Sequence, residues 1–381
     1  MTDEISRNYR SKDSTSLPGA LAGTRVIDLS RILGGPYCGQ VLADHGAEVI
    51  KVEPPQGDDT RLWGPPFKQI DGKAVSAYYL GLNRNKKGMT LDLASQSGRD
   101  TLLTLLQGAD VVLENFKTGT MEKWGIGYED LSKQFPRLIH CRVSGFGADG
   151  PLGGLAGYDA AVQAMAGIMS VNGEKDGEPL RVGLPVVDMV TGLNAVIGVL
   201  LALNERTRSG RGQFVESSLF DSGISLLHPH AANWFMDKKE PKLSGNAHPN
   251  IYPYDAFPTK TTSIFLAVGN DKQFNLLCGA LGLEELASIT EYASASARSK
   301  NRESLQKHLL SKFSKIDGES ICHKLMELGV PCAPVLTVSA ALNHSHTKHR
   351  EMVISIGENY QGVASPIKLS RTPATYRLAP P

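Results

Sequence analysis

The first 150 residues alternate short apolar runs with stretches of helical periodicity. The apolar runs are rich in valine, isoleucine and leucine and end at glycine, proline or polar residues, a pattern typical of buried strands. The predicted strands are residues 24–29, 47–53, 89–93, 111–115 and 138–144, and the predicted helices are 37–45 and 95–106. A strand, a helix and a second strand in this order build parallel sheets. The pattern therefore predicts an α/β fold with a doubly wound sheet.

The hydrophobic pattern changes in the second half of the chain. A helix at 158–170, a helix from Asp188 to Gly210 and a strand at 213–219 are predicted to complete the first domain. The later elements are a polar linker at 241–258, a strand at 263–268 and helices at 271–281, 303–313 and 319–328. This second group predicts a smaller α+β domain. The expected organisation is a flexible tail over residues 1–20, a large domain over 21–225, a small domain with linkers over 226–333 and a return to the large domain over 334–381.

Neither the longest apolar stretch nor the start of the chain predicts a membrane protein. The stretch at 189–203 is interrupted by polar residues and glycine and is too short to span a bilayer, so it predicts a buried helix. Residues 1–17 are polar, with mixed charge, and lack the apolar core of a signal peptide. We therefore expect a cytoplasmic protein.

The composition excludes several classes of function. The chain has 381 residues, of which 41% are hydrophobic, and a formal net charge of +1. Such a balance excludes a large binding surface for nucleic acid or anionic membranes. The five cysteines are odd in number and none has C-x-x-C spacing, which is typical of a reduced protein. The histidines lack the spacing of a zinc site, so we predict no metal.

Asp188 is a lone carboxylate between two apolar runs, within Gly-Leu-Pro-Val-Val-Asp-Met-Val-Thr-Gly. Burying a charge without a partner is costly, so an acid at this position needs a reason. One interpretation is a helix N-cap, for which aspartate is a favoured residue. The other is a nucleophilic carboxylate at a helix start, where backbone N–H groups stabilise an anion. Position alone favours the cap, and the remainder of the chain favours the nucleophile.

The first predicted βαβ unit imitates a dinucleotide-binding layout, since its second strand ends in an acidic residue, Glu53. The fingerprint G-x-G-x-x-G is absent, and Pro36 stands where the backbone would approach a pyrophosphate, which disfavours a nicotinamide enzyme. Basic residues nevertheless gather in loops at the ends of predicted strands. They are Arg61, Arg84, Lys86, Lys87 and Lys123. A solvated charge run is one interpretation, and a large anionic ligand that carries an adenine is the other.

A set of motifs extends from Leu21 to about Tyr376. The motifs are Gly23–Ser30, Gly35-Pro36, Leu42–Pro54, Asp59–Arg61, Asn83–Lys87, Glu114–Phe116, Gly145–Gly147, Gly157–Asp159, Asp188 and Ser209–Gln213. Together they resemble the family III CoA transferases, which include formyl-CoA transferase, carnitine CoA transferase and α-methylacyl-CoA racemase. Further stretches are similar to the succinyl-CoA:glutarate type. These stretches are residues 60–67, 78–80, 252–257 and 268–274.

The resemblance implies a fold, a ligand and a catalytic residue. The implied fold is a Rossmann-like large domain with a smaller α+β domain, in an interlocked homodimer. Asp188 matches the family's catalytic aspartate. The implied coenzyme A site comprises Arg31, Leu33, Gly34, Leu91, Asn115, Phe116, Lys123, Tyr158 and Asp159. Coenzyme A thioester is implied as a substrate, with a free carboxylic acid as its partner and no tightly bound cofactor.

Tyr158 distinguishes two activities within the family. The racemases carry a histidine as proton-transfer base at this position, whereas a phenol with a pKa near 10 is a poor base at neutral pH. Tyr158 therefore favours transfer and is predicted to pack on the CoA tail. An acyl-CoA racemase or epimerase and a non-catalytic CoA-binding protein are the alternative functions.

We hypothesise that Asp188 attacks the thioester carbonyl of an acyl-CoA donor and then carries CoA as an aspartyl thioester. The backbone N–H groups at Gly269 and Asn270 are the expected donors to the oxyanion. A dicarboxylate is the expected acceptor, and Arg61 or Arg181 could bind its remote carboxylate.

Overall fold

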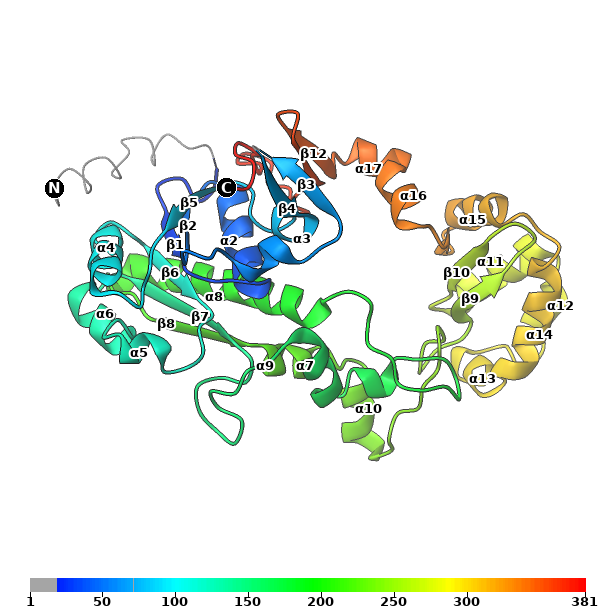
Figure 1. Ribbon diagram of the computed structural model, residues 1–381. Helices are drawn as coiled ribbons and strands as arrows, with labels where there is room; N and C mark the ends of the chain where they lie inside the picture. Colours follow the sequence, from blue (N-terminus) through cyan, green and yellow to red (C-terminus); the bar gives the residue numbers. More distant parts are fainter. Residues whose placement is uncertain (1–18, 71) are drawn as a thin grey trace. The chain divides into compact units, whose positions relative to one another are not determined.

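The computed structural model describes residues 19–70 and 72–381, which form two compact units (Figure 1). The large unit comprises the described residues of Met1–Ile168 together with Val182–Leu227 and Ser345–Pro381. The small unit comprises Met169–Arg181 and His228–His344. The flexible tail expected over residues 1–20 lies outside the described residues except at its last two positions.

The large unit is built on a six-stranded sheet in which each strand is parallel to its neighbours. The order across the sheet is β5 (Lys86–Thr90), β2 (Glu48–Glu53), β1 (Arg25–Asp28), β6 (Val111–Glu114), β7 (Ile139–Ser144) and β8 (Phe214–Ser218). Numbered along the chain, this is the 3-2-1-4-5-6 order of doubly wound sheets, which confirms the predicted α/β class. The order reverses between β1 and β6, and open sheets bind ligands at such a switch point.

Helices cover both faces of this sheet. One group is α2 (Gly34–Asp44), α7 (Asp159–Met165), α8 (Val186–Ser209) and α9 (Leu219–Ser225), and the other is α4 (Gln96–Leu106), α5 (Thr120–Lys123) and α6 (Tyr128–Gln134). Neighbouring residues of β1 divide between the two apolar cores, because successive side chains of a strand point to opposite faces. Val26 packs in the core that includes α2 and α8, and Ile27 packs in the core that includes α4. Burial on both faces explains the continuous apolar runs in the sequence.

Helix α8 lies very close to α2 because Gly192 has no side chain. A Cβ atom at Gly192 would lie only 2.6 Å from the carbonyl oxygen of Gly34. Val187, Ala195 and Val199 are buried on the same helix. The N-terminal turns of α2 and α8 are therefore held side by side near the carboxyl ends of the central strands.

Residues 189–203 form a helix as predicted, but in the single chain that helix is buried on one side only. Leu193, Ile197 and Leu201 are 36%, 54% and 64% exposed, and the helix extends to 24 residues. Apolar residues occur all around this helix, so the sequence pattern did not show which side would be free. It is the one helix among the described residues whose length and apolarity would suit a membrane span. That is weak evidence for a membrane, because core helices share these properties.

Two more elements differ from their predicted positions. The strand expected at 89–93 is β5, which begins at Lys86, because the Lys86 side chain is fully buried rather than solvated. Its ammonium lies 2.9 Å from Asp28 Oδ2. The helix expected over 158–170 is only α7, since Gly167 adopts a left-handed backbone with φ 84° soon after it ends.

Short elements complete the large unit. They are the 3₁₀ helix η1 (Asp59–Leu62), the β3–β4 hairpin (Phe67–Ile70, Lys73–Ser76), α3 (Ala77–Leu80), α17 (Ser345–His349) and the β12–β13 hairpin (Val353–Ile356, Tyr360–Val363).

The small unit has an antiparallel sheet ordered β11 (Cys332–Pro334), β10 (Ser263–Ala267), β9 (Tyr254–Pro258). Its helices are η2 (Met169–Val171), α10 (His230–Asp237), α11 (Asp271–Leu281), α12 (Glu284–Ala287), α13 (Ala295–Lys300), α14 (Arg302–Phe313), α15 (Gly318–Glu327) and α16 (Val338–Asn343). The helices predicted at 271–281, 303–313 and 319–328 are confirmed. The linker predicted over 241–258 ends too late, because its last residues form β9 and bury Phe257.

Candidate functional site

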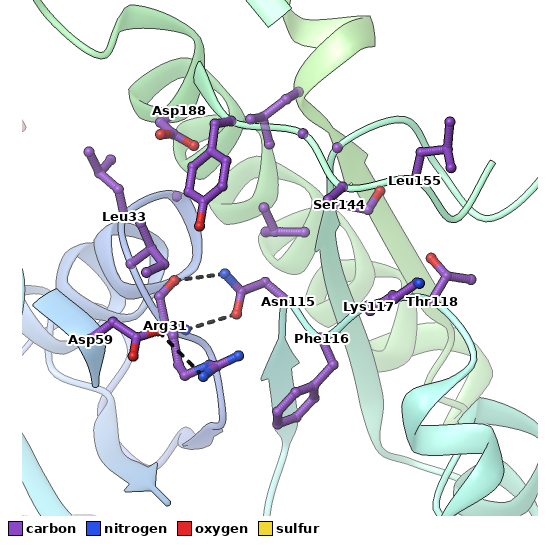
Figure 2. A pocket seen from close by; sticks show the side chains of 18 residues that line it. Arg31, Leu33, Asp59, Asn115, Phe116, Lys117, Thr118, Ser144, Leu155 and Asp188 are labelled. Carbon is purple, nitrogen blue, oxygen red and sulfur yellow. Dashed lines mark hydrogen bonds and ion pairs between the residues drawn. The ribbon is translucent and has the colours of Figure 1, made fainter. Parts of the chain in front are cut away.

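A cavity of about 250 Å³ lies where β1, β6 and β7 end, at the switch point of the sheet (Figure 2). Its lining comprises residues 31–34, Asp59, 115–118, 143–145, 155–158, Asp188 and Leu219. All of these residues belong to the large unit. The cavity therefore combines loops that follow three parallel strands with the first turn of α8, which carries Asp188.

Asp188 does not cap α8. The helix begins at Val186 with Pro185 in the N-cap position and no side-chain capping bond, so Asp188 lies inside the first turn. Burial raises the pKa of Asp188 to about 7, and the nearby Asp159 carboxylate contributes to the rise. Among the described residues, the Asp188 carboxylate has no hydrogen-bond donor and no cation as partner. The N-cap interpretation is wrong, and the cavity contains a carboxylate that is costly to charge.

Gly34 lies directly against Asp188. A Cβ atom at Gly34 would be 3.3 Å from the carbonyl oxygen of Asp188 and 3.7 Å from its Oδ1. The first residue of α2 therefore approaches the acid with backbone alone. A side chain at position 34 would fill the space beside the carboxylate.

Arg31 and Asn115 join the two sides of the switch point (Figure 2). The backbone N–H of Arg31 donates to Asn115 Oδ1 at 2.8 Å, and Asn115 Nδ2 donates to the Arg31 carbonyl at 2.7 Å. The Arg31 guanidinium lies 3.6 Å from the Asp59 carboxylate at the mouth of the cavity. This pair fixes the loop after β1 relative to the end of β6.

The buried ion pair of Lys51 and Asp58 holds the same loop through hydrogen bonds to its backbone. Lys51 Nζ donates to the Ser30 carbonyl at 2.8 Å and to Asp58 Oδ2 at 3.0 Å. The other oxygen of Asp58 accepts from the N–H of Ile32 at 3.4 Å. Ile32 has φ 72°, a left-handed conformation that costs a β-branched residue on the order of 1–3 kcal/mol. The ion pair holds the loop in a shape that Ile32 would not adopt by itself.

A second cavity of about 340 Å³ adjoins the first and shares Arg31, Phe116 and Lys117 with it. Its other walls are mainly apolar. They include Leu29, Val52, Pro54, Leu91, Leu93 and Trp124. The Phe116 and Trp124 rings meet edge to face with centroids 5.5 Å apart. An apolar slot with aromatic walls and one lysine at its border suits a flat heteroaromatic ring that carries phosphate.

The structure brings most of the predicted site residues together. The first cavity is lined by Arg31, Leu33, Gly34, Asn115, Phe116, Tyr158 and Asp188, and the second by Leu91. Lys123 and Asp159 line neither cavity. Lys123 ends α5, and Asp159 begins α7 and directs its carboxylate to the backbone of Val187 and Asp188.

The other predicted residues have partners of their own. Asn270 caps α11 by accepting from the Gln273 N–H at 2.9 Å, and the Gly269 N–H donates to Gln273 Oε1 at 2.8 Å. Both belong to the small unit, as does Arg181. Arg61 makes two 2.8 Å bonds to the Glu53 carboxylate.

Several functional candidates near the cavity were not predicted as site residues from the sequence. Lys117 and Thr118 follow Asn115 and Phe116 in the loop after β6, so their position at a strand end was a usable signal. Tyr78 lines neither cavity but lies near Asp188, since burial and the charges of Asp188 and Asp159 raise the pKa of its phenol to about 12. Nothing in the local sequence around Tyr78 shows this proximity.

Comparison with known proteins gives consistent results. The model of CoA-transferase family III matches residues 21–381. A succinate–glutarate CoA-transferase of Agrobacterium fabrum is 39% identical over 368 residues, which cover 95% of this chain and 92% of that protein. A succinyl-CoA:mesaconate CoA-transferase of Haloarcula hispanica is 38% identical, with 93% and 91% covered. The crystal structure of a CaiB/BaiF family protein from Brucella suis superposes with a TM-score of 0.86 at 40% identity and covers 96% of both chains.

Proposed function

The chain belongs to CoA-transferase family III and is a CoA-transferase, and from this premise we propose that it moves CoA from an acyl-CoA, such as succinyl-CoA, to a free dicarboxylate. The observation that carries the proposal is Asp188, a carboxylate without a partner among the described residues, in the first of two adjoining cavities. Relatives named for glutarate and mesaconate as well as succinyl-CoA support a dicarboxylate acceptor.

The two cavities suggest how CoA binds. We place the adenine in the slot formed by Leu91, Phe116 and Trp124, because these apolar and aromatic walls suit a purine. Lys117 borders both cavities and can pair with phosphate. The pantetheine arm then follows the Arg31–Asn115 pair into the first cavity, which ends at Asp188. Lys123 is not a lining residue, so any contact it makes would be at the periphery.

Asp188 acts as the nucleophile in the proposed mechanism. Its carboxylate attacks the thioester carbonyl, the C–S bond breaks, and a mixed anhydride and CoA thiolate form. The thiolate attacks the aspartyl carbonyl, releases the donor acid as a carboxylate and leaves CoA on Asp188 as a thioester. The acceptor carboxylate attacks that thioester to form a second anhydride, whose acyl carbonyl the thiolate then attacks. The new acyl-CoA leaves and the Asp188 carboxylate is regenerated.

The structure gives the anion-binding residues unequal support. An oxyanion needs free donors. The Asn270 N–H has no partner among the described residues, whereas the Gly269 N–H is already bonded to Gln273. We therefore propose Asn270 as the better donor of the two. Arg61 or Arg181 is proposed for the acceptor's remote carboxylate, and Arg61 already makes two hydrogen bonds to Glu53.

The exposed side of α8 supports self-association. Leu193, Ile197 and Leu201 form an apolar stripe on the single chain, and large exposed apolar areas mark interfaces. We propose that this stripe is covered in an interlocked homodimer. We also propose that the protein works in the cytoplasm, in keeping with its five free cysteines.

Mass spectrometry of CoA thioesters tests the proposal. The protein is incubated with succinyl-CoA and a panel of mono- and dicarboxylic acids, and the same panel is run with Asp188→Ala. A new dicarboxyl-CoA with the wild type and none with the variant is the expected result. Hydroxylamine added after succinyl-CoA should label Asp188. Exchange that persists in Asp188→Ala contradicts the covalent mechanism, and deuterium uptake at the α-carbon without any acceptor acid would instead indicate a racemase.

A further inference from the structure

We propose that Asp159, held in place by Gln163, is a positioning residue that orients the first turn of α8 and disfavours negative charge on Asp188. This inference rests on the proposed role of Asp188 as nucleophile. It assigns to Asp159 a role other than the CoA contact expected from the sequence. Three observations carry it: the hydrogen bonds of the Asp159 carboxylate, the burial of the pair, and the electrostatic neighbourhood of Asp188.

Asp159 supplies the cap that α8 lacks. The first N–H groups of a helix have no partner within the helix, and Pro185 in the N-cap position has no side-chain acceptor. Asp159 Oδ1 accepts from the N–H of Val187 at 2.9 Å and from the N–H of Asp188 at 3.2 Å. The acceptor thus comes from another helix, α7. Because one of the two bonds is to the backbone of Asp188 itself, Asp159 sets the orientation of the nucleophile's own peptide.

Gln163 fixes the Asp159 carboxylate through the oxygen that does not contact α8. It lies one turn further along α7, and its Nε2 donates to Asp159 Oδ2 at 2.7 Å. Its Oε1 accepts from the N–H of Val182 at 2.8 Å. Gln163 is fully buried and Asp159 is only 8% exposed. Both ends of the 182–188 segment are therefore tied to α7, and the Asp159 charge has a fixed position.

Among the described residues no cation pairs with the Asp188 carboxylate, and Lys117, which lines the same cavity, is not among the charges that shift its pKa. α7 presents Asp159, α3 presents Tyr78, and the loop before α7 presents Tyr158. Burial, together with the charges of these acids, raises the pKa of the Tyr78 phenol and keeps it neutral. The guanidinium of Arg31 is paired with Asp59.

Within residues 19–70 and 72–381, the elements packed on α8 add no cation to the cavity wall around Asp188. α2 contributes Gly34, β7 contributes Val143 and Ser144, and α9 contributes Leu219 to the cavity. Burial raises the pKa of Asp188, and the negative charge of Asp159 raises it further.

A fixed negative charge here favours the covalent intermediate. Free Asp188 is an anion that is repelled by Asp159, whereas Asp188 joined to an acyl group or to CoA is neutral. Acylation therefore relieves the repulsion, and the free enzyme is destabilised relative to the aspartyl thioester. The same repulsion makes the carboxylate more basic, which strengthens a nucleophile once it is ionised.

An exchange of side chains separates charge from hydrogen bonding. Asp159→Asn keeps an oxygen that can accept from the N–H groups of Val187 and Asp188. Its NH2 group, however, would face the NH2 group of Gln163, so that hydrogen bond would be lost. Combining it with Gln163→Glu restores the bond, because the new carboxylate can accept from the Asn amide and from the Val182 N–H. The double variant retains the net charge and moves the negative group one helical turn away. Gln163→Glu alone, which places two carboxylates face to face, is the matched control.

Two measurements are made on the full-length protein. One is the pH dependence of kcat/KM for succinyl-CoA, whose acid limb reports the ionisation of Asp188 in the free enzyme. The other is the fraction of enzyme that carries CoA on Asp188, measured by intact-protein mass spectrometry after addition of succinyl-CoA. In the double variant we expect the acid limb to move down by about one pH unit and the thioester-to-free ratio to fall about tenfold. KM for succinyl-CoA should stay within about twofold, since the CoA-binding residues are unchanged.

The outcomes distinguish the inference from the proposed function. An acid limb and a thioester ratio equal to those of the wild type, in a folded double variant, would overturn the role of the Asp159 charge. If the double variant does not fold, Asp159→Asn alone supplies both readouts, because it keeps the acceptor for the α8 backbone. A wild-type enzyme that exchanges CoA without ever carrying it on Asp188 contradicts the proposed mechanism instead.

Discussion

Arg31 and Asn115 exchange two hydrogen bonds, of 2.8 and 2.7 Å, across the point where the strand order of the sheet reverses. The Arg31 main chain and the Asn115 side-chain amide each donate one of these bonds. The cavity that contains Asp188 lies beside them. The loop that follows β1 is thereby tied to the loop that follows β6, and CoA is expected to lie along both.

Asn115→Ala should therefore weaken acyl-CoA binding. Loss of two hydrogen bonds of about 1 kcal/mol each would raise KM for succinyl-CoA on the order of tenfold, because the Arg31 loop is no longer held. Steady-state kinetics at saturating acceptor acid measures the effect. Asn115→Asp, which retains the acceptor but not the donor, is the control. Its KM should lie between those of the wild type and Asn115→Ala. An unchanged KM in Asn115→Ala would show that the loop is held by its buried charges alone.

Trp124→Ala should affect only donors that carry the adenosine part of CoA. The indole forms a wall of the second cavity, where we place the adenine. We expect KM for succinyl-CoA to rise roughly tenfold, in line with the loss of about 1–1.5 kcal/mol of aromatic contact. Succinyl-pantetheine, which ends before the adenosine, provides the comparison. Equal losses for both thioesters would place the adenine elsewhere.

Asp188→Asn should stabilise the protein at alkaline pH. The folded pKa of Asp188 is raised to about 7, so the folded state retains a proton that the unfolded chain releases. The stability that this proton contributes is present below the unfolded pKa and is lost as pH rises through the folded value. The neutral amide avoids the loss, which amounts to at most about 4 kcal/mol. Thermal scans should show a Tm higher by several degrees above about pH 8 and nearly equal near pH 4. A gain that is the same at both pH values would contradict the shifted pKa.

Lys51→Met should destabilise the large unit. Lys51 and Asp58 are both inaccessible and 3.0 Å apart, so removal of the lysine leaves a buried carboxylate without a cation. Breaking such a pair costs about 3–5 kcal/mol, which corresponds to a fall in Tm of roughly 10 °C. The double variant Lys51→Met with Asp58→Asn should recover a large part of the loss. A double variant as unstable as the single one would indicate that the hydrogen bonds of Asp58, not its charge, hold the loop.

Much of the large unit could be predicted from the sequence because its strands are buried on both faces. The pair Val26-Ile27 contains no polar residue, and the strand around it, Arg25–Asp28, lies within one residue of its predicted bounds. Asp188 was also visible, since an acid between apolar runs stands out in a single sequence. The motifs indicate the family without any knowledge of the sheet order.

The remaining features depend on contacts that no local pattern encodes. Lys86 resembles a surface lysine until Asp28, far away in the sequence, is found beside it. The first turn of α8 begins at Val186, and the cap it needs comes from Asp159 on another helix through backbone N–H groups, which leave no trace in the sequence. Tyr78 reaches the neighbourhood of Asp188 by tertiary packing alone.

The absence of a side chain at Gly192 has a consequence for how this enzyme can evolve. With only 2.6 Å available to a Cβ before the Gly34 carbonyl, even an alanine would force the two helices apart. The spacing between the start of α2 and the first turns of α8, which carry Asp188, is thus set by main chain on both sides. New acid substrates should arise through replacements around the rim, while this pair of glycines stays unaltered.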